Sequence, residues 1–327
     1  MLNVGIIGAG DFGAAHARAI AQTADVRLVA ASRTNIKALS DFCKEFACKG
    51  YTNYQNLLED EAVEAVVVAT PHHLHTSIVE AASRAGKHIL LEKPMAPNLL
   101  ECDRIIAVTQ EHKVQLMLGH VNHFVPAYIK AKEVLESGEL GELVYAHSTM
   151  TKAWMTSNRR DWHLDRMTGG GMWLTIGVHV LDQLCWLIDS ELASISADIK
   201  TSFHAQEADD IGVALLRFKN GVSATASAIG YQTGVFKFLS ELTCSKGLLK
   251  ISHKDGVFIG RDERWQKVVG SSADDFMEQS MVNEWTAFRD ALKNNKPMPV
   301  TGEFARVVMQ AAFAAEASSR EKREIYL

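Results

Sequence analysis

Apolar and polar positions follow one pattern through the first 121 residues of this 327-residue chain. Short, near-continuous apolar runs alternate with longer stretches in which apolar residues recur every three or four positions. The runs are typical of strands buried in a parallel sheet, and the stretches are typical of helices that cover it. Strands are expected at residues 4–7, 26–31, 63–69, 87–91 and 114–119, and helices at residues 14–23, 36–47, 77–85 and 97–112. This alternation predicts a right-handed, doubly wound parallel α/β sheet.

A second pattern, rich in strands, begins near residue 122. The run Val-Ser-Ala-Thr-Ala-Ser at 222–227 alternates apolar and polar side chains, and Asn220-Gly221 before it is a hairpin turn. Strands are expected at residues 143–152, 195–203, 211–219, 222–231, 238–244, 248–252 and 256–260, and helices at residues 122–135, 172–188, 277–294 and 301–321. We therefore divide the chain into domains 1–121 and 122–327. Because no helix is left for the second face of this sheet, we expect it to join a homodimer or homotetramer.

Composition narrows the classes of protein. A hydrophobic content of 47% and a charged content of 22% are ordinary for a globular protein, and no apolar run is long enough to span a membrane. The net charge of -5 implies no general attraction to nucleic acid or to a membrane surface. The five cysteines are scattered without C-x-x-C spacing, and the chain enters its first strand without room for a signal peptide. We expect a cytoplasmic protein with reduced thiols.

A glycine-rich turn joins the first predicted strand to the first helix. It reads Gly8-Ala9-Gly10-Asp11-Phe12-Gly13 and has G-x-G-x-x-G spacing. Gly8 allows the tight turn, Gly10 lets the backbone approach a pyrophosphate, and Gly13 lets the helix pack against the strand. The helix N-terminus, which begins with Asp11 and Phe12, favours the negative charge of the phosphates. The turn therefore predicts a dinucleotide site.

The end of the second strand bears on which dinucleotide binds. A site for NAD usually has an acidic residue there, which binds the ribose 2′-hydroxyl. This chain has Ser32, Arg33 and Thr34 instead. Arg33 can pair with a 2′-phosphate and stack on adenine, and the two hydroxyls can donate hydrogen bonds. We expect NADP(H), with NAD also possible; the alternative is that Arg33 is a solvated surface residue and both cofactors are used.

Polar residues follow the next two strands. Thr70, Pro71, His72 and His75 are expected in the cofactor region, with helix capping and packing as the role of His75. The histidine spacing matches no zinc pattern, and no acidic or cysteine partner is nearby, so we expect no metal.

The following strand leads into Glu92-Lys93-Pro94. A lysine at this edge of the sheet is well placed to hydrogen-bond a substrate oxygen during hydride transfer. The alternative is a surface charge.

Taken together, these motifs resemble the Gfo/Idh/MocA family of glucose–fructose oxidoreductases and inositol dehydrogenases. The resembling segments are residues 5–13, 69–75, 85–94 and 169–179. The resemblance implies a Rossmann domain followed by an α/β domain with a large, mostly antiparallel open sheet. It also implies a tightly held NAD(P) and a redox reaction at a carbinol or carbonyl of a sugar, cyclitol or related ring. Glu92 and Lys93 match the family's E-K-P motif.

The family places a D-x-x-x-H pair on a helix beside the reacting carbon. His179 matches the histidine, whereas Thr175 stands where aspartate is usual. Thr175, His179 and Asp182 share one face of the predicted helix, because they are spaced four and three residues apart. We expect His179 to exchange or position the hydroxyl proton together with Lys93, and Asp182 to orient His179. A core histidine is the structural alternative.

Substrate contacts are expected from two further places. Asn122 and His123 stand where many family members carry paired arginines. The loop after residue 153 holds Trp154, Asn158, Arg159, Arg160, Asp161, Trp162, His163 and Asp165. Exposed indoles such as Trp162, beside arginines, suit a sugar-like ring, with an oligomer contact as the alternative.

We expect an NAD(P)-dependent oxidoreductase acting on CH–OH groups of a sugar, inositol or other cyclic polyol. Three alternatives stay open: a redox-neutral NAD-dependent glycoside-cleaving enzyme, an NAD(P)-binding regulatory protein, and a dihydrodiol or ketone reductase. Intact Lys93 and His179 count against the regulatory protein, whereas Thr175 counts mildly for it.

Overall fold

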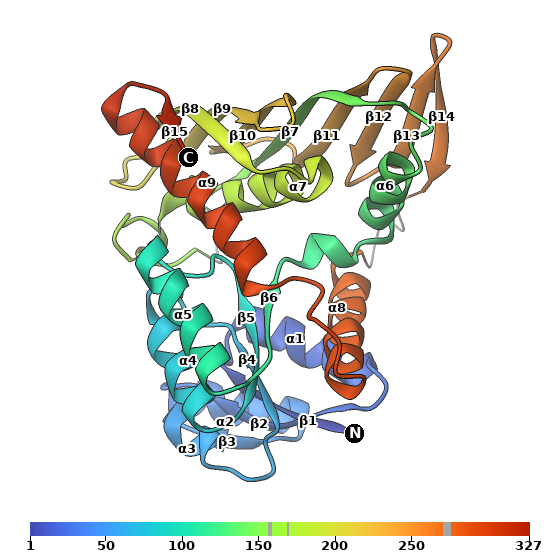
Figure 1. Ribbon diagram of the computed structural model, residues 1–327. Coiled ribbons are helices and arrows are strands. Elements are labelled where there is room, and N and C mark those ends of the chain that lie inside the picture. Colours follow the sequence, from blue (N-terminus) through green and yellow to red (C-terminus); the bar gives the residue numbers. More distant parts are fainter. Residues whose placement is uncertain (156–158, 169, 271–275) are drawn as a thin grey trace. The chain divides into compact units, whose positions relative to one another are not determined.

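The structure, a computed structural model, describes all residues except 156–158, 169 and 271–275. The chain forms two compact units, and neither is continuous in sequence (Figure 1). Unit 1 combines Met1–Val121 with Met277–Arg306, and unit 2 combines Asn122–Phe276 with Val307–Leu327. The predicted division at residue 121 takes the chain in order, whereas the contacts return residues 277–306 to the first unit.

Unit 1 is built on a parallel sheet of six strands in the order β3-β2-β1-β4-β5-β6. The strands are β1 (Leu2–Ile7), β2 (Val26–Ser32), β3 (Lys49–Tyr51), β4 (Ala65–Val68), β5 (His88–Glu92) and β6 (Leu116–Gly119). All four residues of β4 are fully buried, as expected for a strand covered on both faces. The prediction of a Rossmann-type sheet is confirmed.

Helices cover both faces of this sheet (Figure 1). They are α1 (Asp11–Gln22), α2 (Ile36–Phe46), α3 (Tyr54–Leu58), α4 (His75–Arg84), α5 (Leu99–Glu111) and α8 (Phe276–Lys293), with a 3-10 turn at His72–Leu74. Helix α8 buries Met281, Trp285 and Phe288, which follow the three-to-four-residue spacing of one helix face. The Trp285 indole N–H donates to His16 of α1. This apolar face explains why a late segment of the chain belongs to the first unit.

Unit 2 is built on a sheet of nine strands in the order β14-β13-β12-β11-β7-β10-β9-β8-β15. Neighbours run antiparallel, except that β10 is parallel to β7. The strands are β7 (Leu143–Ala153), β8 (Leu192–Lys200), β9 (Ile211–Phe218), β10 (Ser223–Tyr231), β11 (Lys237–Cys244), β12 (Gly247–Ser252), β13 (Gly256–Arg261), β14 (Arg264–Val269) and β15 (Ile325–Tyr326). This arrangement confirms the large, mostly antiparallel sheet.

Helices of unit 2 lie on one face of its sheet (Figure 1). They are α6 (Pro126–Glu136), a π-helical turn (Trp173–Gly177), α7 (Val178–Ile188) and α9 (Gly302–Glu321, in unit 2 from Val307), with 3-10 turns at Val121–Phe124 and Asp161–His163. On the helix-covered face, Gln183 of α7 accepts from Ser240 of β11. In β10, Ala224, Ala226 and Ala228 are buried and the residues between them are half-buried, which matches the predicted alternation.

Some elements differ from the expectation. The segments β3, α3, β14 and β15 were not expected, and the helix expected at 172–188 opens with the π-helical turn. None of the described helices is long and apolar enough to cross a membrane.

Candidate functional site

The glycine-rich turn of unit 1 has the backbone shape that its spacing predicts. Gly8 has a φ of +102°, and a Cβ there would lie 2.5 Å from the Ala69 carbonyl oxygen. A Cβ at Gly13 would lie 2.4 Å from the Gly8 carbonyl oxygen, so only glycine lets α1 approach β1 this closely. A Cβ at Gly10, by contrast, would meet no atom within 4 Å. The turn is therefore tight inside and open at Gly10, which fits the approach of a pyrophosphate.

The end of β2 lies against this turn. The Ser32 carbonyl accepts the backbone N–H groups of Gly8 and Ala9, at 3.0 and 3.1 Å, while the Ser32 residue is buried. The Arg33 guanidinium donates to the Ala9 carbonyl at 2.9 Å and is half-buried. Thr34 is exposed. Arg33 therefore lies beside the glycine turn and is not a freely solvated surface charge.

The loop after β4 is joined to the loop after β5 through His75. This side chain is buried at the start of α4; its Nε2 lies 2.9 Å from the Thr70 carbonyl oxygen and its Nδ1 3.2 Å from that of Met95. Burial lowers the pKa of His75, while its two carbonyl partners oppose that shift. The Thr70 hydroxyl is buried without a hydrogen-bond partner among the described residues, which fits a polar ligand atom at this edge. His72 is also buried, next to Pro71.

Glu92 and Lys93 lie where β5 ends. Glu92 is buried; its Oε1 lies 3.0 Å from His16 Nε2, and its Oε2 accepts the Lys93 backbone N–H at 3.2 Å. Lys93 is half-buried, and its peptide bond to Pro94 is cis. A Cβ on Gly119 of β6 would lie 2.7 Å from Glu92 Oε1. The Glu92 carboxylate is thus held inside unit 1, directly before the lysine.

In unit 2, the helix expected to carry the reaction begins with the π-helical turn. Thr175 lies in this turn and is 9% exposed, and His179 is half-buried on α7. Asp182 is fully buried, and its Oδ1 lies 2.8 Å from His123 Nε2. The His123 ring stacks on Trp186, with 4.1 Å between ring centroids. His123 as the partner of Asp182 was missed, although the sequence shows it next to Asn122.

The expected substrate residues of unit 2 have different surroundings. Asn122 is buried, and its side-chain N–H₂ has no hydrogen-bond partner among the described residues. Trp162 is half-buried and stacks on His163, with 3.5 Å between ring centroids. The expectation that Trp154 is an exposed indole is wrong, because it is fully buried beneath the Arg159 guanidinium. Asn158, expected in the same loop, lies outside the described residues.

Comparison with known families matches both units. The family model described as "Oxidoreductase family, NAD-binding Rossmann fold" matches residues 2–120, and the "GFO/IDH/MocA C-terminal domain" matches residues 128–250. The chain belongs to the GFO/IDH/MocA family of oxidoreductases. The family resemblance, the fold class and the expectation of an NAD(P)-linked oxidoreductase are thereby confirmed.

Relatives in this family include enzymes of known activity. Myo-inositol 2-dehydrogenase of Thermotoga maritima is 27% identical over 100% of this chain and 98% of its own length. The 1-carboxy-3-chloro-3,4-dihydroxycyclohexa-1,5-diene dehydrogenase of Comamonas testosteroni is 33% identical over 63% of this chain, which spans about half (52%) of that relative. Levoglucosan dehydrogenase solved with NADH and L-sorbose has a TM-score of 0.92 at 20% identity, covering 100% of this chain and 98% of that one. The last match shows the GFO/IDH/MocA fold alone.

The start of the π-helical turn before α7 is capped by an aspartate that the sequence analysis missed. The Trp173 backbone N–H donates to Asp209 Oδ2 at 2.6 Å, and that of Met172 donates to the Asp209 carbonyl at 2.9 Å. Burial raises the pKa of Asp209 to about 7. Residues 169–171 are all glycines and have no side chain that could cap the helix. The sequence therefore indicated that a residue from elsewhere in the chain must supply the cap. Gly169 lies outside the described residues.

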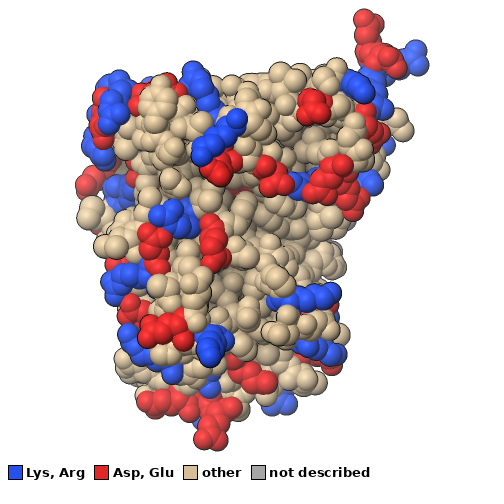
Figure 2. Space-filling model, in the orientation of Figure 1, with Lys and Arg blue, Asp and Glu red and all other residues tan. Residues whose placement is uncertain are grey.

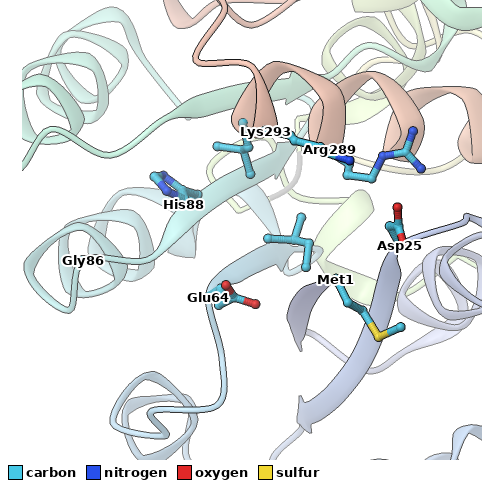
Figure 3. Close-up of a pocket in the computed structure, with 9 residues that line it drawn as sticks. Met1, Asp25, Glu64, Gly86, His88, Arg289 and Lys293 are labelled. Carbon is cyan, nitrogen blue, oxygen red and sulfur yellow. The ribbon is translucent and has the colours of Figure 1, made fainter.

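A cavity of about 530 Å³ also opens in unit 1 (Figure 3). It is lined by Met1, Leu2, Asp25, Glu64, Gly86, His88, Arg289, Leu292 and Lys293. This cavity lies where β1 and β5 begin, whereas ligands of doubly wound sheets bind where strands end. Glu64 already accepts the Asn3 backbone N–H, and Arg289 pairs with Asp290. We assign no function to this cavity.

Neither the charged side chains on the surface in Figure 2 nor the possible metal ligands among the described residues indicate a further candidate site. On the described surface drawn in Figure 2, acidic and basic side chains are interspersed without a continuous basic area. Among the described residues, no three His, Cys, Asp or Glu side chains gather as a metal site needs.

Proposed function

We propose that this chain is a dehydrogenase that prefers NADP(H) and acts on a carbinol or carbonyl carbon of a sugar, an inositol or a related cyclic polyol. Membership of the GFO/IDH/MocA family supports the NAD(P)-linked chemistry. The observation that carries the cofactor preference is the position of Arg33, whose guanidinium lies on the glycine turn where a carboxylate would otherwise select NAD.

The residues of unit 1 fit a bound dinucleotide. Gly8, Gly10 and Gly13, with Asp11 and Phe12 at the start of α1, would hold the pyrophosphate. Arg33 would bind the 2′-phosphate, with Ser32 and Thr34 beside it. Because Ser32 is buried, Thr34 is the better placed hydroxyl. The rest of the dinucleotide would lie against the loops after β4 and β5. These loops carry Thr70, Pro71, His72, His75, Glu92 and Lys93.

The protein side chains manage the proton and the position of the substrate. When bound, the nicotinamide accepts or supplies the hydride. We assign Lys93 to polarise the reacting oxygen, and His179 to take up the hydroxyl proton or return it. Thr175 offers a hydroxyl where the family usually has a carboxylate. Asp182 acts as a positioning residue, through His123 and through the helix that bears His179.

The substrate class follows from the full-length relative. Its name specifies inositol, a hydroxylated six-membered carbon ring. Asn122, whose side-chain N–H₂ is otherwise unsatisfied, would hydrogen-bond a ring hydroxyl. Trp162 would pack on the ring. A ring dihydrodiol is the second candidate, because the Comamonas relative is named for a dihydroxycyclohexadiene and shares 33% identity with this chain.

We also propose a homodimer or homotetramer formed through the sheet of unit 2. Tyr145 donates to or accepts from Thr225 at 2.7 Å and Val213 is 45% exposed; in their strands these residues alternate with the buried Ala146, Ala224 and Ala214, so they lie on the opposite face. This small, mixed apolar and hydroxyl surface is suited to a second copy of the same sheet. All five cysteines are free thiols, including Cys43 and Cys48 with 3.7 Å between their sulfur atoms, which supports a reducing, cytoplasmic location.

The test follows nicotinamide absorbance while the purified chain is mixed with NADP or NAD and a panel of cyclitols, aldoses, ring dihydrodiols and their keto forms. We expect turnover that favours NADP, falls at least about 1,000-fold in Lys93→Met, and persists in Lys296→Met, an exposed lysine of the same unit. Arg33→Ala should raise KM for NADP about 10- to 100-fold and leave KM for NAD nearly unchanged.

Each contrary result selects an alternative. Equal use of both cofactors by the wild type and by Arg33→Ala would refute the NADP preference. Ring cleavage without net absorbance change would indicate the redox-neutral enzyme. Tight cofactor binding with no turnover on the whole panel would favour the regulatory protein and would make Thr175 the residue to explain.

A further inference from the structure

A chain of buried polar groups leads from α8 to the lysine after β5. Trp285 Nε1 lies 3.2 Å from His16 Nδ1, and His16 Nε2 lies 3.0 Å from Glu92 Oε1. Glu92 Oε2 accepts the Lys93 backbone N–H. His16 and Trp285 are fully buried and Glu92 nearly so. These groups come from three elements of unit 1 and end at the residue proposed to act on substrate.

The direction of these hydrogen bonds fixes the state of His16. An indole N–H can only donate, so His16 Nδ1 must accept. A ring whose Nδ1 accepts cannot be doubly protonated, so its one proton is on Nε2. That N–H then donates to Glu92, which acts as the acceptor at both of its oxygens. His16 is therefore neutral and provides no positive charge to balance a carboxylate.

A second carboxyl group lies beside this chain. Glu284 precedes Trp285 on α8, is fully buried, and has no hydrogen-bond partner for either oxygen among the described residues. Glu92, in contrast, accepts two donors. Two buried negative charges facing each other would be costly, and the better solvated one stays ionised. Burial and the facing Glu92 charge raise the pKa of Glu284 well above its usual range, so Glu284 is the protonated member.

Space for the Glu92 carboxylate is also built into the sheet. Gly119 pairs with Glu92 across β5 and β6, and any side chain there would meet the carboxylate. The other titratable groups that face Glu92 are His16 from α1, Glu284 from α8 and His75 from α4. His16 is neutral by its hydrogen bonds, and burial raises the pKa of Glu284, so we assign the negative charge of the described carboxyl pair to Glu92.

We propose that Trp285 and His16 are positioning residues that hold Glu92 as a fixed carboxylate, beside a protonated Glu284, and that Glu92, through its bond to the Lys93 N–H, fixes the main chain from which the lysine reaches the substrate. The proposal deepens the proposed function, since it rests on the role assigned to Lys93. The proposal gives α8, which comes late in the chain, a role in positioning the main chain of Lys93 in the first unit.

The first test needs no turnover. In ¹⁵N NMR of the whole protein, with His16→Gln used for assignment, His16 should carry its proton on Nε2 and none on Nδ1. In Trp285→Phe the His16 Nδ1 loses its donor, so its ¹⁵N signal should shift. Trp285→Phe should also shift the Lys93 amide signal, whereas Thr286→Ala, which removes a bond within the same helix, should not.

The protonated carboxyl group has its own signature. At a pH where an ordinary glutamate is ionised, the wild type should show the infrared band of a carboxylic acid, and Glu284→Gln should lose the Glu284 contribution to it. Because the native pKa of Glu284 is raised, the wild type loses stability as pH rises from about 4.5 toward that pKa. Glu284→Gln should remove this loss. A band that is absent from the wild type would show that Glu284 is ionised and would overturn the assignment.

Kinetics then separate the inference from the proposed function. Trp285→Phe should lower kcat about 10- to 100-fold and change KM less than about twofold, while Thr286→Ala behaves as wild type. A wild-type His16 with its proton on Nδ1, or an unmoved Lys93 amide in Trp285→Phe, overturns the inference whatever the turnover. Moved signals in a protein without turnover support the positioning chain and overturn only the proposed function.

Discussion

At the scale of single residues, Asp182 shows how a buried carboxylate can serve two partners. It was expected to orient His179, and the structure gives it a hydrogen bond with His123, whose ring lies flat against Trp186. A charge-assisted bond in a fully buried place holds the helix to the residues beside Asn122. The same negative charge would raise the basicity of a histidine one turn away.

Replacing Asp182 with asparagine separates these roles. The loss of the buried charge should destabilise the protein by about 2 kcal/mol, the usual worth of a hydrogen bond to a charged group. Because a negative charge one turn from His179 is removed, it should also move the acidic limb of the kcat–pH profile to lower pH.

Urea unfolding and the pH dependence of kcat measure the two effects, with Asp189→Asn, an 85% exposed acid at the end of the same helix, as the control. An unchanged profile together with reduced stability would restrict Asp182 to its bond with His123.

At the scale of elements, the long regular helices and strands could be predicted from the sequence. The very short elements, and features that depend on contacts with another part of the chain, could not. Strand β3 has three residues and α3 has five, so neither has room for a periodic pattern. The glycine turn was predictable because it depends only on local backbone shape. The burial of Trp154 was not, because it depends on where Arg159 folds.

The capping of the π-helical turn by Asp209 could not be predicted either, because Asp209 and Trp173 are far apart in sequence. It makes the stability of unit 2 depend on pH. The pKa of Asp209 is raised from 3.8 to about 7 by burial, with Glu316 adding to the rise and Arg166 opposing it. The native state therefore binds more protons than the unfolded chain between these values, and stability falls as pH rises from about 4 to 7.

Asp209→Asn should remove the Asp209 contribution to this decline, because the amide oxygen still accepts the Trp173 N–H and carries no charge. The difference between the two proteins should reach at most about 4 kcal/mol above pH 7, the equivalent of three pKa units. Chemical unfolding at intervals from about pH 4 to 8 measures it. Parallel curves for the two proteins would mean that Asp209 titrates normally.

At the scale of the whole molecule, the helix-free sheet face of unit 2 makes self-association a testable property. Val213 and Tyr145 lie on neighbouring parts of that face and are 45% and 37% exposed. A lysine at position 213 would bring two like charges into a symmetric contact, because an isologous interface repeats every substitution.

Val213→Lys should therefore weaken association at least about tenfold, measured by sedimentation across a concentration series. Val235→Lys, at an 81% exposed position between β10 and β11, should leave it unchanged. A wild type that sediments as a monomer at micromolar concentration would refute the proposed oligomer.

The division of unit 1 into two distant segments also matters while the protein is being made. Residues 1–121 emerge from the ribosome first, but the helix that supplies Trp285 and Phe288 to their core emerges only after residues 122–276. At about 5–20 residues per second, the six-stranded sheet waits roughly 10 to 30 s for its last helix. During that interval the side of α1 that Trp285 covers in the finished protein stays open to solvent, so newly made chains should be more prone to aggregate than finished ones.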